Sequence, residues 1–148
     1  MIKDFAKTKG DLKITLWDSE GTIKLQKEEK NLTVALGLNW IVSRMESDTP
    51  GVMTSMKLGS GTTAPTSLDT DVESVLGTAV AFSQAPDVVD NTIKYYCTFG
   101  AGVSVGAVTE AGIFNAADLM LCRTTFGVVT KEADDIMGIE WTIQIDAA

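Results

Sequence analysis

The chain has 148 residues, of which 45% are apolar and 22% charged, and its 12 basic and 20 acidic side chains give a formal net charge of -8 at pH 7. This length predicts one domain that can bury a hydrophobic core without a metal ion or a disulfide. Because the chain has no histidine, catalysis by a histidine base and zinc sites with histidine ligands are excluded. The excess of acidic residues disfavours nucleic-acid binding. No apolar run approaches the roughly 20 residues that span a bilayer.

The N-terminal thirty residues are comparatively basic. They hold seven lysines and six acidic residues, formally +1, whereas residues 31–148 are formally -9. We therefore predict a basic N-terminal arm at residues 1–10, followed by a single domain at residues 11–148. The arm carries three lysines that would dock on an acidic neighbouring chain: Lys3, Lys7 and Lys9. Deleting such an arm would weaken assembly with little change in melting temperature.

The acidic charges have a second interpretation, and the N-terminus supports one further expectation. Between Lys57 and Lys94 the chain has five acidic residues and no basic residue, and this stretch is also explained as a solvated surface that aids solubility, with no docking role. The first residues lack the apolar segment of a secretory signal, so we expect the protein to fold in a cytoplasm.

The next elements in chain order are a hairpin and a helix. Residues 12–17 and 22–28 alternate apolar and polar side chains around a turn, which predicts a β-hairpin. From Thr33, the expected N-cap, apolar residues recur at helical spacing until the turn at residues 48–51. The face expected to pack on the sheet comprises Val34, Leu38, Ile41, Val42 and Met45. Gly37 lowers helix propensity, so we expect it to permit close packing against the sheet.

Beyond the helix, the pattern predicts strands. Six segments qualify: residues 52–58, 78–83, 93–99, 107–114, 119–126 and 139–145. Residues 59–70 and 86–91 are rich in turn-forming side chains and are expected to be loops. The alternation of apolar and polar side chains indicates burial on one face, which is typical of antiparallel sheets. We predict an antiparallel β-sandwich of seven or eight strands with one packed helix near the N-terminus.

Two patterns resemble ligand sites but are better explained as turns. Residues 59–63 are glycine-rich, but the lysine that a phosphate-binding loop requires is missing. Asp69, Asp71 and Glu73 offer three carboxylates to a calcium ion, but the loop glycine and the distal glutamate of an EF-hand are absent. A solvated acidic turn is therefore expected. We predict no catalytic residue, no cofactor and no metal site.

Two pairs of residues are expected to matter for structure. Cys97 and Cys122 fall on the apolar side of their strands, which favours buried free thiols; a disulfide would require the two strands to be neighbours. Glu110 and Arg123 lie on strands expected to be adjacent, where they would form a charge-assisted ion pair within one chain or between subunits.

Five segments have a distinctive order between residues 31 and 145. They are KNLTVALGLNWIVSRM, MTSMKLGSGTTAPTSLDTDVESVLG, YYCTFGAGVSVGAVTEAGIFNA, LMLCRTTFGVVTKEADD and IEWTIQI. In this order and spacing the chain resembles a family of small virion or tail-fibre-type structural proteins of tailed bacteriophages. The most specific pieces are residues 59–65, 109–115 and 141–143. The resemblance supplies no ligand-binding residue.

The resemblance implies a non-enzymatic structural protein that works by association. We expect an exterior capsid decoration or cement protein of the virion, assembled in the host cytoplasm, whose partners are copies of itself in a homotrimer and the major capsid protein. One alternative is a tail fibre, collar or baseplate module that contacts tail proteins. Another is a module that binds a receptor or carbohydrate, for which the candidate exposed aromatic residues are Trp17, Trp40 and Tyr96.

Overall fold

The computed structural model describes residues 6–147, in which nine strands and one short helix form a mainly β structure. In chain order the elements are β1 (Ala6–Trp17), β2 (Ile23–Thr33), α1 (Ala35–Ser43), β3 (Met53–Gly59), β4 (Val75–Ala81), β5 (Asp87–Val89), β6 (Thr92–Phe99), β7 (Gly106–Asn115), β8 (Met120–Lys131) and β9 (Ile136–Ala147). Neighbouring strands pair antiparallel. The predicted antiparallel, mainly β class with one helix near the N-terminus is confirmed.

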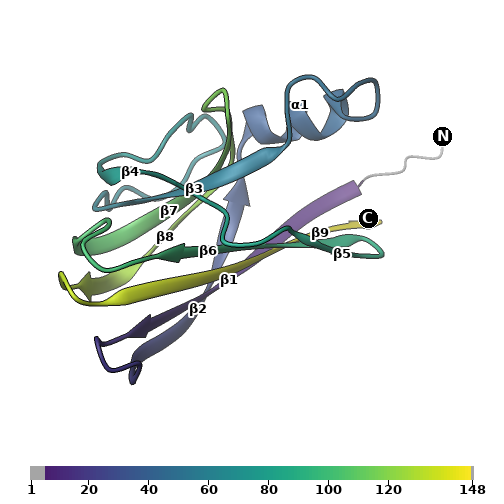
Figure 1. The fold of residues 1–148 in the computed structure, drawn as a ribbon. Coiled ribbons are helices and arrows are strands. Elements are labelled where there is room, and N and C mark those ends of the chain that lie inside the picture. The colour runs from purple at the N-terminus through teal and green to yellow at the C-terminus, as the bar shows by residue number, and fades with distance from the viewer. Residues whose placement is uncertain (1–5, 148) are drawn as a thin grey trace.

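The strands form one curled sheet rather than the predicted sandwich of seven or eight strands (Figure 1). Their order is β4-β3-β7-β8-β2-β1-β9-β6-β5. Among the described strands, the ladder between β2 and β8 has only two residue pairs, Leu32 with Arg123 and Thr33 with Cys122. This short junction links the two halves of a half-barrel, and the halves enclose the core as two layers would. The additional strand is β5, a three-residue segment within the stretch predicted to be a turn.

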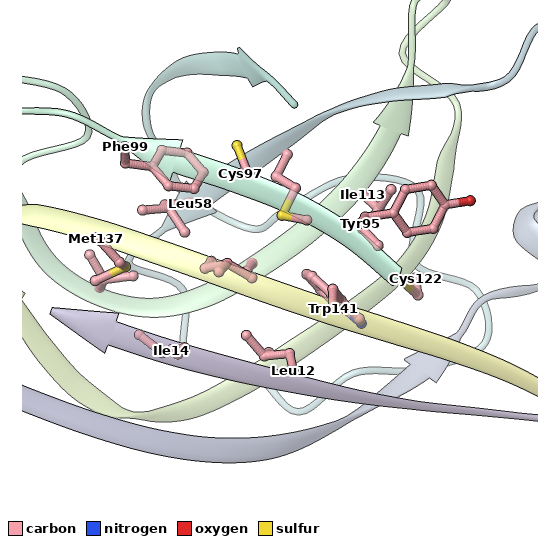
Figure 2. Close-up of a cluster of buried hydrophobic side chains, with 14 of the residues drawn as sticks. Leu12, Ile14, Leu58, Tyr95, Cys97, Phe99, Ile113, Cys122, Met137 and Trp141 are labelled. Atoms are coloured by element: carbon pink, nitrogen blue, oxygen red, sulfur yellow. The ribbon is translucent and has the colours of Figure 1, made fainter. Parts of the chain in front are cut away.

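The core lies on the concave side of the sheet (Figure 2). The alternation predicted for β6 and β9 is confirmed at six inward positions, which are buried: Tyr95, Cys97, Phe99, Ile139, Trp141 and Ile143. The other two predicted positions are more open, since Ile93 is half-buried and Ile145 is 38% exposed. The indole Nε1 of Trp141 donates to Oδ1 of Asn31 at 3.0 Å, which satisfies its only donor inside the core.

The two cysteines are buried free thiols, as predicted. Burial raises the pKa of the Cys97 thiol to about 12, and that of Cys122 well above its ordinary value. Both side chains therefore remain protonated near neutral pH and behave as small apolar groups.

The packing face predicted for the helix is confirmed in part: Val34 is buried and Ile41 packs against the core, whereas Leu38, Val42 and Met45 are exposed. Its N-cap is Val34, without a side-chain cap hydrogen bond, because Thr33 is the last residue of β2. Gly37 is also buried, and a Cβ added there would lie 2.0 Å from the carbonyl oxygen of Leu121 on β8. The predicted close approach at this glycine is confirmed. Leu38 and Val42 point to solvent, so α1 approaches the sheet on its glycine side.

Part of the predicted N-terminal arm belongs to the sheet. Residues 6–10 pair with the end of β9, from Ala6 opposite Ala147 to Gly10 opposite Ile143. Lys7 and Lys9 are exposed, and Lys9 Nζ lies 3.7 Å from a carboxylate oxygen of Asp146 in the same chain. Lys3 lies outside the described residues. The predicted boundary after residue 10 therefore falls inside β1.

Candidate interaction surface

The ion pair predicted between Glu110 and Arg123 is present and buried. Arg123 Nε donates to Oε1 of Glu110 at 3.1 Å, and Nη2 lies 3.0 Å from the same oxygen in an ion-pair contact without hydrogen-bond alignment. Glu110 is 0% exposed and Arg123 is 2% exposed. They face each other within one chain, on the adjacent strands β7 and β8. The pair therefore joins β7 to β8 inside the protein.

Glu110 also attaches the long loop between β3 and β4 to the sheet. Its carboxylate accepts backbone N–H groups from Gly61 at 2.6 Å, Glu73 at 2.7 Å and Ser74 at 2.9 Å. Thr109 Oγ1 donates to the carbonyl oxygen of Gly61 at 2.7 Å. The glycine-rich segment that resembled a phosphate-binding loop is thus bound to the protein's own carboxylate.

The three acidic residues of this loop bind different partners. Asp69 accepts from Arg123 at 3.0 Å, Asp71 from Lys57 at 3.1 Å, and Glu73 from the backbone N–H of Thr62 at 3.2 Å. Burial alone would raise the pKa of Asp69, but hydrogen bonds from Thr66 and Arg123 outweigh it and lower that pKa. Within residues 6–147 no three histidine, cysteine or acidic side chains are grouped to hold a metal ion.

An apolar groove of about 230 Å³ opens between α1 and the concave side of the sheet. Its lining consists of Trp40, Ile41, Arg44, Ile93, Tyr95, Leu121, Ile143 and Ile145. The position of α1 is fixed by the turn that follows it, because Trp40 Nε1 donates to the carbonyl oxygen of Gly51 at 3.0 Å. Arg44 lies over the Trp40 ring, with its guanidinium carbon 5.9 Å from the ring centre. The helical wall of the groove is therefore held in place by these contacts.

The groove continues to the edge strand β5. Ile143 pairs with Ile93, and Ile93 pairs with Val88, so these three side chains share one face of the sheet. Val88 is 69% exposed. The row of apolar side chains thus runs from the core out to a sheet edge with an open hydrogen-bonding side.

The outer side of α1 adds a second apolar feature. Leu38 and Val42 on α1, and Met45 in the turn directly after it, recur at the spacing of one helical face and are 44%, 65% and 85% exposed. Helix α1, β5 and the C-terminal end of β9 lie at the same end of the half-barrel (Figure 1). We name the groove, Val88 and this helical stripe the apolar end. Exposed apolar side chains gathered at one end of a molecule favour an interaction site there.

Comparisons with protein-family models, curated proteins and solved structures found no match to this chain. In the described range, no helix has the length and apolar character required to cross a membrane.

The sequence could not reveal the groove because its residues come from four separate elements, α1, β6, β8 and β9. The helical stripe did carry a sequence signal, the apolar spacing after Thr33, but the pattern did not indicate that this side faces solvent. Of the three aromatic candidates, Trp40 lines the groove, whereas Trp17 and Tyr96 border one depression on the opposite face of the sheet.

Proposed function

We propose that this protein is a non-enzymatic structural component of a tailed-bacteriophage virion that associates with copies of itself through the apolar end. The observation that carries the proposal is the exposed apolar stripe of α1 beside an apolar groove. Burial of such surface is favourable by roughly 25 cal/mol per Å². The resemblance of the ordered sequence segments to phage structural proteins supports the same role.

The charges around the apolar end favour a second copy as its occupant. Lys7 and Lys9 are exposed on β1 beside the end of β9, while Glu46 and Asp48 are exposed in the turn after α1. A surface with charges of both signs around an apolar centre can complement a copy of itself. The proposed association is a homotrimer on the virion exterior, in contact with the major capsid protein; its threefold symmetry and its location rest on the family resemblance.

The association is tested by sedimentation velocity on the full chain. The wild type should sediment as an oligomer, and the double variant Val42→Asp with Met45→Asp as a monomer with unchanged circular dichroism. Leu68→Asp is the matched control because Leu68 is 82% exposed on the loop between β3 and β4. A monomeric wild type, or a double variant that remains oligomeric, would contradict the proposal.

The location is tested by counting copies in purified particles with quantitative mass spectrometry against the major capsid protein. Capsid decoration predicts a copy number on the order of hundreds, as expected for an icosahedral lattice. A few tens of copies or fewer would instead support a tail, collar or baseplate position. Absence from particles would refute a virion role.

A further inference from the structure

The convex face of the sheet carries a second surface feature, opposite the groove. It is a depression of about 300 Å³ over β2, β1, β9 and β6. Its lining includes two aromatic residues, Trp17 and Tyr96, and a set of polar residues: Lys13, Thr15, Gln26, Ser83, Gln84, Thr98 and Glu140. Aromatic and polar side chains that converge in a depression are typical of small-molecule sites.

Trp17 forms a fixed apolar platform in this depression. A Cβ added at Gly138 would lie 2.7 Å from Cζ3 of Trp17, so the indole packs against the backbone of β9 where a side chain is missing. Trp17 itself remains partly exposed. The glycine therefore creates the space in which the ring lies across the strands.

Tyr96 is held in one orientation on the other side of the depression. Its hydroxyl donates to Oδ2 of Asp87 at 2.6 Å, and this hydrogen bond is the main cause that raises the pKa of Tyr96 to about 12. Its backbone carbonyl accepts the N–H of Ser83 at 2.9 Å, which fixes the segment that carries Ser83 and Gln84. The second aromatic ring and the adjoining wall are thus positioned by the fold.

The side chains beside Trp17 are polar but uncharged. The strand register places Gln26, Thr15, Gly138 and Thr98 in one row across four strands. Gln26 Nε2 donates to Thr15 Oγ1 at 3.4 Å. The next row contains Glu28, Lys13, Glu140 and Tyr96, in which the charges alternate. The site beside the platform therefore offers amide and hydroxyl groups without a net charge.

We propose that this depression binds a neutral hexopyranose unit of an oligosaccharide. A pyranose ring has an apolar C–H face that matches the Trp17 indole, and its hydroxyls both donate and accept hydrogen bonds, as do the exposed side chains of Gln26 and Thr98. An adjoining depression of about 410 Å³ shares Lys13 and Glu140 with this site and accommodates a neighbouring sugar unit.

The test is isothermal titration calorimetry of the full chain with neutral trisaccharides built from glucose, N-acetylglucosamine, galactose or mannose, and with sialyllactose as an anionic probe. At least one neutral trisaccharide should bind with a Kd of about 1 mM or lower. Trp17→Ala should weaken that binding at least about tenfold, equivalent to about 1.4 kcal/mol. Thr98→Val, which removes a hydroxyl with little change in shape, should weaken it in the same direction and serves if Trp17→Ala does not fold.

Leu68→Ala is the control because Leu68 is 82% exposed on the loop between β3 and β4 and lines neither the depression nor the groove, so this variant should retain the wild-type affinity. Three results would overturn the proposal: no binding of any neutral probe, equal binding to wild type and both site variants, or binding of sialyllactose alone. The depression and the groove are on opposite faces of the sheet. The proposal of sugar binding can therefore be refuted while self-association is confirmed, and the reverse is also true.

Discussion

At the residue scale, the carboxylate of Glu110 connects β7, β8 and the loop between β3 and β4 through Arg123 and three backbone N–H groups. Glu110→Gln keeps the size of the side chain but removes its charge and presents an NH₂ group to donors. We expect the free energy of unfolding to fall by about 3–5 kcal/mol, as for other broken buried ion pairs, measured by urea denaturation. Glu73→Gln, at an exposed residue of the same loop, should cost much less. Equal effects of the two substitutions would refute this role.

Gly37 provides a second prediction at the residue scale. In an exposed helix, glycine to alanine stabilises by about 1 kcal/mol, but at Gly37 the new Cβ would lie 2.0 Å from the carbonyl oxygen of Leu121. Gly37→Ala should therefore destabilise the protein by about 1–3 kcal/mol, the usual effect of overpacking. Thermal unfolding gives the comparison with Asn39→Ala, an exposed position of the same helix. A higher melting temperature for Gly37→Ala would show that α1 can move away from β8.

At the element scale, a helix or strand could be predicted from the sequence where its apolar residues are buried on one side only. The strands β6 and β9 were found because alternate residues such as Tyr95 and Trp141 are buried in one core. The helix was found from its period, and Val34 and Ile41 pack inward as predicted, but Leu38 and Val42 face solvent because α1 has apolar residues on both sides. Strand β5 was missed since three residues are too few to show a period.

A deletion in β1 tests whether residues 6–10 belong to the folded domain or to a separate N-terminal arm. Residues 6–10 pair with β9, so deleting residues 1–10 removes part of the sheet. We expect the melting temperature to fall by more than about 5 °C, which for a chain of this size corresponds to a loss of roughly 2 kcal/mol. Deleting residues 1–5, which removes none of these pairs, is the control and should have little effect. An unchanged melting temperature for the longer deletion would restore the boundary after residue 10.

At the scale of the whole molecule, the curling of the nine strands into one sheet could not be predicted from the sequence. The candidate Glu110 and Arg123 pair was predictable because its two strands are consecutive in the chain and pair directly. The groove and the convex depression depend on pairings between distant segments, such as β1 with β9 and β2 with β8. Local periodicity carries no information on which of many strands become neighbours.

One contact between distant segments also predicts how the whole molecule responds to acid. Asp135 lies between β8 and β9, and its pKa is lowered by hydrogen bonds from Lys24 Nζ at 2.8 Å and from the backbone N–H of Glu132 at 2.9 Å. Since the folded pKa is below the unfolded value, the stabilisation is complete above the unfolded pKa, about 4, and is lost as pH falls through the folded pKa. Asp135→Asn should thus melt at a lower temperature than the wild type at neutral pH, and this difference should shrink below about pH 4. Thermal unfolding followed by circular dichroism across this range measures both curves.

Lys30→Ala removes an exposed lysine whose contact is Asp11, and should leave the acid response unchanged. A constant difference between Asp135→Asn and the wild type at every pH would mean that the ionised Asp135 carboxylate does not hold β2 to the turn before β9.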